Sequence, residues 1–412
     1  MNKKLMTACA IGSALEWFDY TLYGTFATTL AKLFFPSENE SSSLLWTYLI
    51  FAFGFFSRPI GGVIFGHIGD RVSRKTALMI SIFTMSFPTF VTGLLPTFKS
   101  IGIWAPLLLS LIRLLQGIAI GGEFTGAMVY LVENAPARRR GIFGCWSDFG
   151  CPCGVLLGLL VSGILTSCLS VEDFETFGWR IPFLFGIIIA FFGAYLRNGI
   201  EDTENPSKKN SIPLVETVKK HKKAILCVVF INAFGGCLFY ILNTYLHNYF
   251  KMSGLLTTKQ ALWFTAIVSA FTTIAIPIGG ILSDKFGRKK IMMVSLYLFI
   301  ICSYPMFCTL NSESLYTHLF FEGIVGFSNG LFWGGRAAFY AETFPHHLRC
   351  TAVALAFGIS HSLFAGSTPF VSEFLMSKTG TCYSIAGFII LLAILAILSL
   401  HKLEDRTAKE LR

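Results

Sequence analysis

Charged residues are scarce in this sequence. Asp, Glu, Lys and Arg make up 14% of the 412 residues, whereas a soluble domain carries about 25%. Apolar types reach 54%, and the mean hydropathy is +0.64. A soluble fold cannot bury so much Phe, Ile and Leu, so most of the surface must face lipid. The composition therefore excludes a soluble domain and predicts an all-α integral membrane protein.

Several chemical signatures are also missing. The 11 cysteines lie singly, apart from Cys151 and Cys153, and form neither a metal-ligand pattern nor a disulfide framework. No H-E-x-x-H, G-x-S-x-G or nucleotide-binding motif occurs. The net charge of +10 sits in short loops, not on one face of a soluble module. We therefore expect no enzyme activity, no metal or cofactor and no nucleic-acid partner.

The sequence contains instead a series of apolar stretches long enough to cross a hydrocarbon core of about 30 Å. The first six cover 9–34, 46–66, 76–95, 105–132, 142–167 and 179–198. The second six cover 224–250, 260–282, 290–309, 316–342, 351–375 and 382–400. The first stretch carries Glu16 and Asp19, which argues against a cleavable signal peptide. We predict an N-terminal six-helix bundle (1–198), a cytoplasmic connector (199–223), a C-terminal six-helix bundle (224–400) and a cytoplasmic tail (401–412).

Lysines and arginines in the loops gather on the face that holds the amino terminus. They include Lys3, Lys4, Arg71, Lys75, Arg138, Lys219, Lys223, Lys285, Lys290 and Lys402. The opposite face keeps few basic residues and several acidic ones, among them Glu172 and Asp173. Because cytoplasmic loops of membrane proteins are enriched in Lys and Arg, we predict that both termini are cytoplasmic.

An internal repeat links the two halves. The chain reads PIGGVIFGHIGDRVSRK at 59–75 and PIGGILSDKFGRKK at 277–290. A second echo pairs Glu133-Asn-Ala-Pro136 with Glu342-Thr-Phe-Pro345. Each match falls at the same place in its half, as expected of parallel repeats related by an axis along the membrane normal. The glycines let helix ends approach closely.

These repeated segments resemble the loop motif of the major facilitator superfamily, although Ser73 stands where the family usually has glycine. Further motifs resemble its metabolite:proton symporter branch: Glu16-Trp17-Phe18-Asp19-Tyr20, Arg58-Pro59-x-Gly61-Gly62, Arg113-x-x-Gln116-Gly117 and Trp179-Arg180-Ile181-Pro182-Phe183. The branch includes carriers of proline/betaine, 2-oxoglutarate, citrate and shikimate. The resemblance implies a bacterial inner membrane, a small-molecule solute and a twelve-helix fold. Proline or betaine rank slightly ahead of carboxylates on resemblance alone.

Ionisable side chains at membrane depth mark a functional path by default. The acids Glu16, Asp19, Glu123, Asp148 and Glu322 outnumber the arginines Arg58, Arg113 and Arg336, with His361 as a further base. A buried carboxylate without a cation tends to take up a proton, so we expect a proton as the coupling ion. At 1.5 Å per residue, Asp19 and Arg113 reach nearly the same depth from opposite sides. We expect them to pair near the midplane, as the acid and arginine of sugar-porter relatives do.

Other residues complete the predicted site. Glu16, Asp19, Tyr20 and Tyr23 share one helical face and should line a cavity. Glu123 and Asp148 serve either proton exit or a solute ammonium group, or merely bond a neighbouring helix. Aromatic walls suit quaternary ammonium ligands, while Arg336 suits carboxylates. The proton-coupling candidates are Asp19, Glu16, Arg113 and Glu123. The solute-binding candidates are Tyr20, Tyr23, Gln116, Asp148, Asn232, Tyr240, Asn243, Trp333 and Arg336.

Charges near the repeated loops predict a cytoplasmic gate that holds the outward-facing state. We expect one network of Asp70, Arg71, Arg74, Glu133 and Arg139, mirrored by Asp284, Arg288, Glu342 and Arg349. Loop charge that only sets topology is the alternative. The sequence thus predicts a proton-coupled symporter of a small polar solute. A passive facilitator and a non-transporting sensor on the same fold are the rival functions, and the oligomeric state is open.

Overall fold

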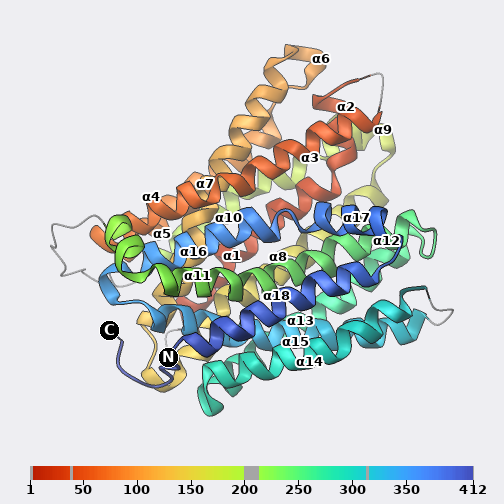
Figure 1. Cartoon of the computed structure of the whole chain (residues 1–412). Coiled ribbons are helices and arrows are strands. Elements are labelled where there is room, and N and C mark those ends of the chain that lie inside the picture. The colour runs from red at the N-terminus through yellow and green to blue at the C-terminus, as the bar shows by residue number, and fades with distance from the viewer. Residues whose placement is uncertain (1–2, 38–39, 199–212, 312–314, 412) are drawn as a thin grey trace.

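The computed structural model describes residues 3–37, 40–198, 213–311 and 315–411. Within these ranges every regular element is helical and no β-strand is present. Helices satisfy their backbone hydrogen bonds internally, which a lipid-exposed segment needs because hydrocarbon offers no partners. The all-α fold predicted from composition is therefore confirmed (Figure 1).

The described chain forms twelve rods, some built from consecutive helices. In the first half the rods are α1 (Lys3–Thr25) with α2 (Ala27–Phe34), α3 (Glu40–Phe56) with α4 (Arg58–Arg71), α5 (Arg74–Leu94), α7 (Trp104–Glu133), α8 (Arg140–Cys168) and α10 (Arg180–Asn198). In the second half they are α11 (Pro213–Tyr240) with η3 (Ile241–Tyr245) and α12 (Leu246–Met252), α13 (Thr258–Phe286), α14 (Arg288–Cys308), α15 (Leu315–Thr343), α16 (Arg349–Ser360) with η6 (His361–Ala365) and α17 (Thr368–Thr379), and α18 (Tyr383–Lys402). Short helices α6 (Phe98–Ile101) and α9 (Val171–Asp173) lie in loops.

By length and composition alone, 8 helical stretches of the described chain are able to cross a membrane. Two other rods are divided into shorter helices by interruptions at Phe26 and Ser57. The predicted spans coincide with the rods to within a few residues at most ends. The length of an apolar stretch therefore predicts where each rod begins and ends, because every rod must cross the same hydrocarbon thickness.

One boundary differs clearly from the prediction. Helix α11 begins at Pro213, inside the segment expected to be a connector up to 223, and residues 199–212 lie outside the described ranges. Its backbone is non-helical at His221, which separates a polar first segment from the apolar remainder. Proline at a first helical position is favourable because its missing N–H has no helical partner there. A hydropathy pattern does not reveal the helical segment before His221, because that segment is polar.

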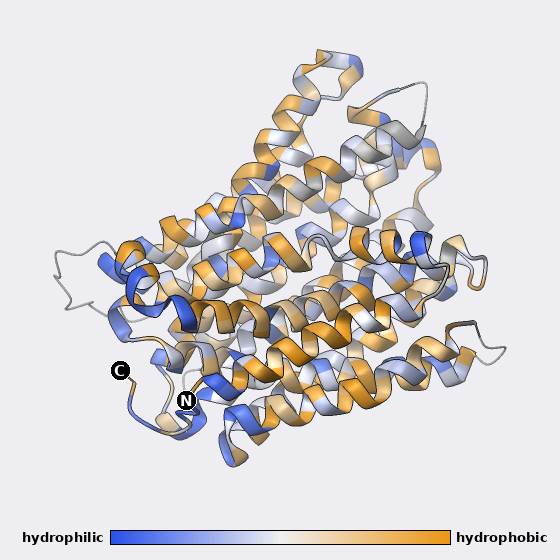
Figure 2. Cartoon of the chain, in the orientation of Figure 1, coloured by the Kyte–Doolittle hydropathy of each residue, from blue (hydrophilic) through white to orange (hydrophobic). Residues whose placement is uncertain are grey.

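The surface of the rods is apolar, as lipid contact requires. Large side chains such as Leu111, Phe191, Phe320 and Leu391 are more than half exposed. Figure 2 shows apolar colour along the rods and polar colour at the end where α1 begins and α18 ends. We call that end, which holds both termini, the terminal face (Figure 1). The ionisable residues named below are, in contrast, mostly buried between helices.

The two halves meet along a seam formed by α4, α7 and α8 on one side and α13, α15 and α16 on the other. Helix α4 packs on α16, and α13 packs on α8. These two contacts are equivalent under the internal repeat, because α4 and α13 carry the matching glycine segments. Toward the end opposite the terminal face, α3 and α7 diverge from α12 and α17 (Figure 1).

Candidate functional site

An ion pair in the first half joins α1 to α7. Arg113 Nη1 donates to Asp19 Oδ2 at 2.7 Å, and both side chains are buried. Gln116 Nε2 donates to the other oxygen of Asp19 at 3.2 Å and to Thr89 Oγ1 at 2.8 Å. The pairing predicted from helix depth is confirmed. Gln116, predicted to bind the solute, thus lies in the Asp19 cluster, and sequence reasoning did not single out Thr89.

Tyr23 supports this ion pair. Its ring lies under the guanidinium of Arg113, with Cζ 3.9 Å from the ring centroid. Its hydroxyl donates to the carbonyl of Thr47 at 3.1 Å, and the residue is fully buried. A face of helix α1 therefore serves two purposes, because the residues nearer its middle turn toward the seam while Tyr23 packs within the first half.

Arg58 stands at the start of α4 beside Glu16. The closest oxygen of Glu16 lies 3.7 Å from Arg58 Nη2, and each side chain is 1% exposed. The rings of Tyr20 and Phe55 lie 5.0 and 4.6 Å from Arg58 Cζ. Glu123, on α7, accepts a hydrogen bond from Ser81 on α5. Arg58 and Arg113 are thus buried near three acids of the same half, Glu16, Asp19 and Glu123.

A second buried ion pair crosses the seam. Asp148, on α8, accepts hydrogen bonds from Nε and Nη2 of Arg336 on α15, the first at 3.0 Å. Arg336 Nη1 donates to Asn232 Oδ1 at 3.2 Å, and Asn232 Nδ2 lies 3.2 Å from His361 Nδ1. This network brings together Asp148, Asn232 and Arg336, all predicted at the solute site. It links three elements of the second half to one of the first.

Aromatic side chains from both halves surround these charges. Trp17 packs edge-on against Phe239 at 4.8 Å and lies 6.0 Å from Tyr240. Phe239 stacks on Trp333 at 5.2 Å, and the indole of Trp333 lies 4.2 Å from Arg336 Cζ. Tyr240 and Trp333 therefore lie where the sequence analysis expected an aromatic wall, and Trp17 and Phe239 extend it.

Two other predicted or noted groups lie elsewhere. Asn243 donates to the carbonyl of Phe239 in its own helix and accepts from Ser269, so its amide is engaged within the second half. Glu322 lies 3.2 Å from His318 one turn away on α15, and both are buried. The structure does not bring Asn243 to the central network, because the π-helical turn η3 directs it toward α13.

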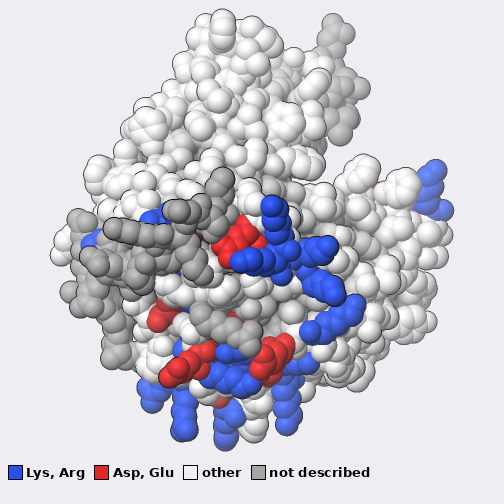
Figure 3. Space-filling model, turned by 60° about the vertical axis from the view of Figure 1, so that its left-hand side comes forward, with Lys and Arg blue, Asp and Glu red and all other residues white. Residues whose placement is uncertain are grey.

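The terminal face is closed by two clusters of charges. In the first gate cluster (Asp70, Arg74, Glu133, Arg349), Arg74 donates to Asp70 and to both oxygens of Glu133. Arg349, from the second half, donates to Glu133 at 2.6 Å. Asp70 accepts from the backbone N–H groups of Cys350 and Thr351, at 3.1 and 2.8 Å, where helix α16 begins. Figure 3 shows acidic and basic side chains gathered on this face.

The second gate cluster (Asp284, Arg288, Glu342, Arg140) repeats this arrangement with the halves exchanged. Arg288 bonds Asp284 and lies 3.5 Å from Glu342. Arg140, from the first half, lies 3.5 Å from Glu342. Asp284 accepts from the backbone N–H groups of Gly141 and Ile142, both at 2.8 Å, where α8 begins.

This geometry corrects two gate assignments. Arg139, expected in the first cluster, is exposed, and its neighbour Arg140 joins the second cluster. Arg349 belongs to the first cluster and not to its mirror, because each cluster takes its last arginine from the opposite half. The assignment of Arg71 to the gate stays a prediction. The sequence could not reveal that the arginines are exchanged between clusters, because the exchange depends on how the two halves pack against each other.

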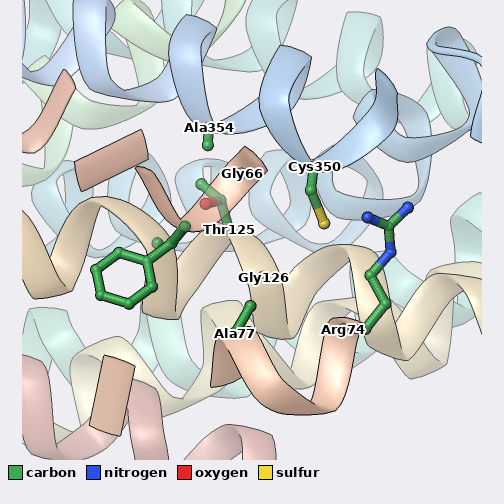
Figure 4. Close-up of a pocket in the computed structure, with 9 residues that line it drawn as sticks. Gly66, Arg74, Ala77, Thr125, Gly126, Cys350 and Ala354 are labelled. Atoms are coloured by element: carbon green, nitrogen blue, oxygen red, sulfur yellow. The ribbon is translucent and has the colours of Figure 1, made fainter. Parts of the chain in front are cut away.

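Glycines allow the halves to approach at the terminal face. A Cβ added at Gly66 would lie 2.7 Å from Thr351 Cα, and one at Gly280 would lie 3.1 Å from Ile142 Cα. The space that remains beside the first gate cluster is a cavity of about 10 Å³, lined by Gly66, Arg74 and Cys350 among others (Figure 4). Such a volume holds about one water molecule. The seam is therefore tightly packed beside this cluster.

The similarity of this sequence to known transporters identifies its family. The chain is 32% identical over its whole length to the glycine betaine/proline/ectoine/pipecolic acid transporter OusA of Dickeya dadantii, and covers 85% of that protein. The chain belongs to the major facilitator superfamily. The proline/betaine transporter of Escherichia coli strain K12 is 31% identical over 96% of the chain, which covers 82% of that protein. As a member of this superfamily, the chain is a multi-pass membrane transporter. The superfamily's transporters are not enzymes.

Family models and solved structures agree with this assignment. Residues 5–205 match the model "Sugar (and other) transporter", and residues 257–412 match "Major Facilitator Superfamily". The proton:xylose symporter XylE, bound to 6-bromo-6-deoxy-D-glucose, superposes with a TM-score of 0.84 at 18% identity, covering 99% of this chain and 97% of that one. A bacterial homologue of the iron transporter ferroportin, in an outward-facing state, gives 0.73 at 14% identity, covering 97% and 98%. At these identities the likeness concerns the superfamily fold alone.

Proposed function

We propose that the protein is a proton-coupled symporter of a small polar zwitterion such as proline or glycine betaine. The names of its relatives support the solute class. The buried Asp19–Arg113 pair carries the proposal for coupling. A proton on Asp19 would cancel its charge and weaken its hold on Arg113, so protonation and the arrangement of α1 and α7 depend on each other.

The terminal face is the cytoplasmic side in this proposal, and the membrane is a bacterial inner membrane. Exposed lysines such as Lys219, Lys223, Lys285 and Lys402 lie near that face, in keeping with the positive-inside rule. The two gate clusters hold the halves together there. Transport then requires both clusters to separate while the opposite ends of the helices close, so that the central residues face each side in turn.

Uptake into proteoliposomes tests the function. We expect labelled proline or glycine betaine to accumulate above its external concentration when the outside is made acidic, and a protonophore to abolish the accumulation. Unlabelled ectoine, pipecolic acid, citrate and 2-oxoglutarate serve as competitors that define the solute class. Equilibration without accumulation would instead identify a passive facilitator. A folded protein that takes up none of these solutes would contradict the proposed transport.

A further inference from the structure

Arg58 differs from the other buried arginines of the seam region. None of its three side-chain nitrogens, Nε, Nη1 and Nη2, has a hydrogen-bond partner among the described residues. Arg336 has partners on all three nitrogens, and Arg113 has one on Nη1. A buried donor left without an acceptor destabilises the fold, and more so when it is charged. A purely structural arginine would be expected to acquire acceptors from the protein.

The surroundings hold the guanidinium in place without satisfying its N–H groups. Tyr20 and Phe55 contact it through their rings, at 5.0 and 4.6 Å from Cζ, and such contacts engage the flat face of the cation. Glu16 Oε1 lies 3.7 Å from Nη2, beyond hydrogen-bonding distance, and Glu16 Oε2 has no partner within the described chain. The Tyr20 hydroxyl and Glu16 face Arg58, but neither supplies the pair of close acceptor oxygens that the edge of a guanidinium can bind.

Further buried polar atoms without partners lie along the aromatic residues that continue from Arg58, and they come from both halves. They are the indole N–H groups of Trp17 and Trp333 and the hydroxyl of Tyr240, each buried and unbonded in the part of the chain described. The Tyr240 ring lies 5.7 Å from that of Phe55, which itself contacts Arg58. Trp17, Phe239 and Trp333 continue the aromatic wall from there. One buried cation thus stands at one end of an aromatic surface that spans the seam.

We propose that Arg58 binds the carboxylate of the transported solute, and that the wall of Trp17, Tyr240, Phe239 and Trp333 receives its ammonium end. This inference rests on the proposed function and assigns the solute's orientation within it. A guanidinium accepts a carboxylate through two parallel charge-assisted hydrogen bonds, and aromatic faces attract organic cations. Arg336 was expected to suit this carboxylate, but Asp148 and Asn232 already occupy its donors.

Pairs of compounds with and without a carboxylate test the inference. Dissociation constants are measured on the purified full-length protein for glycine betaine against choline and for proline against pyrrolidine. In the unsubstituted protein we expect the carboxylate-bearing member of each pair to bind about 100-fold more tightly, because two charged hydrogen bonds depend on it. In Arg58→Gln that preference should fall to nearly onefold, with choline and pyrrolidine affinities unchanged. Arg58→Lys should retain a preference of about tenfold, since it keeps the charge but not the fork.

Arg180→Gln is the matched control. Arg180 donates to the backbone carbonyls of Gly93 and Leu95, within the first half and away from the aromatic wall. Its loss should leave the carboxylate preference at about 100-fold, even if the protein melts at a lower temperature. If Arg58→Gln does not fold, Arg58→Lys carries the test.

The outcomes separate the two proposals. A folded Arg58 variant that keeps the full preference, as expected if only water fills the site, overturns the role of Arg58 and leaves the proposed function intact. Equal binding of glycine betaine and choline by the unsubstituted protein does the same. A folded, unsubstituted protein that binds none of the four compounds overturns the proposed solute class, and the role of Arg58 with it.

Discussion

At the scale of single residues, the buried charges fall into two groups. Asp19 with Arg113, and Asp148 with Arg336, form close ion pairs, one within the first half and one across the seam. Glu16 and Arg58 form a looser ion pair, at 3.7 Å and without a hydrogen bond. Removing one partner of a buried pair leaves an uncompensated charge and typically costs about 3–5 kcal/mol. A free-energy change of this size, caused by protonating one partner of a buried pair, is therefore large enough to shift a conformational equilibrium.

Replacing Asp19 by Asn tests the coupling role. We expect Asp19→Asn to abolish accumulation against a gradient and to spare exchange of labelled for unlabelled solute. The amide cannot take up and release a proton, but it still permits the halves to move with solute bound. Both activities are measured in the same proteoliposomes.

Glu322→Gln provides a control for burial and charge. Glu322 is also a buried carboxylate, but it lies against His318 on its own helix. We expect this variant to accumulate solute. Accumulation by Asp19→Asn at the unsubstituted level would remove Asp19 from the coupling role, whatever Glu322→Gln does.

At the scale of elements, two helices begin on a carboxylate supplied by the other half. Asp70 accepts from the first N–H groups of α16, and Asp284 does so at α8. A helix amino terminus has unpaired N–H groups and a partial positive charge, and both favour an anion. Each gate cluster therefore uses a helix end as part of the contact between halves, and separation of the halves uncovers that end.

Asp70→Asn should weaken the closed terminal face. The loss of charge removes the ion pair with Arg74 and weakens the interaction with the start of α16. A loss of one to two kcal/mol would raise the population open at this face roughly 5- to 30-fold. We expect modification of the buried thiol of Cys350 by a small maleimide, followed by mass spectrometry, to accelerate accordingly.

Asp173→Asn serves as the comparison for this experiment. Asp173 lies in α9 at an exposed position and bonds Ser170, so the same chemical change occurs away from the seam. It should leave the modification rate of Cys350 unchanged. Equal rates in Asp70→Asn and the unsubstituted protein would show that Asp70 does not hold this face closed.

At the scale of the whole molecule, the internal repeat explains the shape of the seam. Contacts between α4 and α16 and between α13 and α8 are made by equivalent segments, so the two sides of the terminal face close by the same means. Small residues permit this closeness, and hydrogen bonds from the gate clusters orient it. Farther along the seam, aromatic and charged residues of both halves meet, as in the contacts Trp17–Phe239 and Asp148–Arg336.

Gly66→Ala should disturb the relation of the two halves. The added methyl would lie 2.7 Å from Thr351 Cα, so α4 and α16 must separate. We expect a lower melting temperature and faster modification of Cys350, because the closed terminal face loses packing. In Gly387→Ala no atom beyond the local backbone of its own helix lies within 4 Å of the added methyl, and both measurements should match the unsubstituted protein. Identical behaviour of the two variants would contradict the close contact at Gly66.

Much of this architecture was readable from the sequence, because its determinants are local. Each apolar run is long enough to span the hydrocarbon, and the repeated glycine segments indicate two related halves. Even the Asp19–Arg113 pair could be predicted, since helical rise alone puts the two residues at one depth. The first turns of α11 were missed because a polar segment gives no hydropathy signal.

Contacts across the seam were decided only by the tertiary structure. Which arginine joins which gate cluster, whether Arg336 is engaged by Asp148, and that Arg58 lacks an internal acceptor all depend on how each helix is rotated and how the halves face each other. Hydrophobic length and periodicity indicate that a helix spans the membrane, but they do not indicate which residues of the other half it contacts. The chemistry of transport depends on those partners.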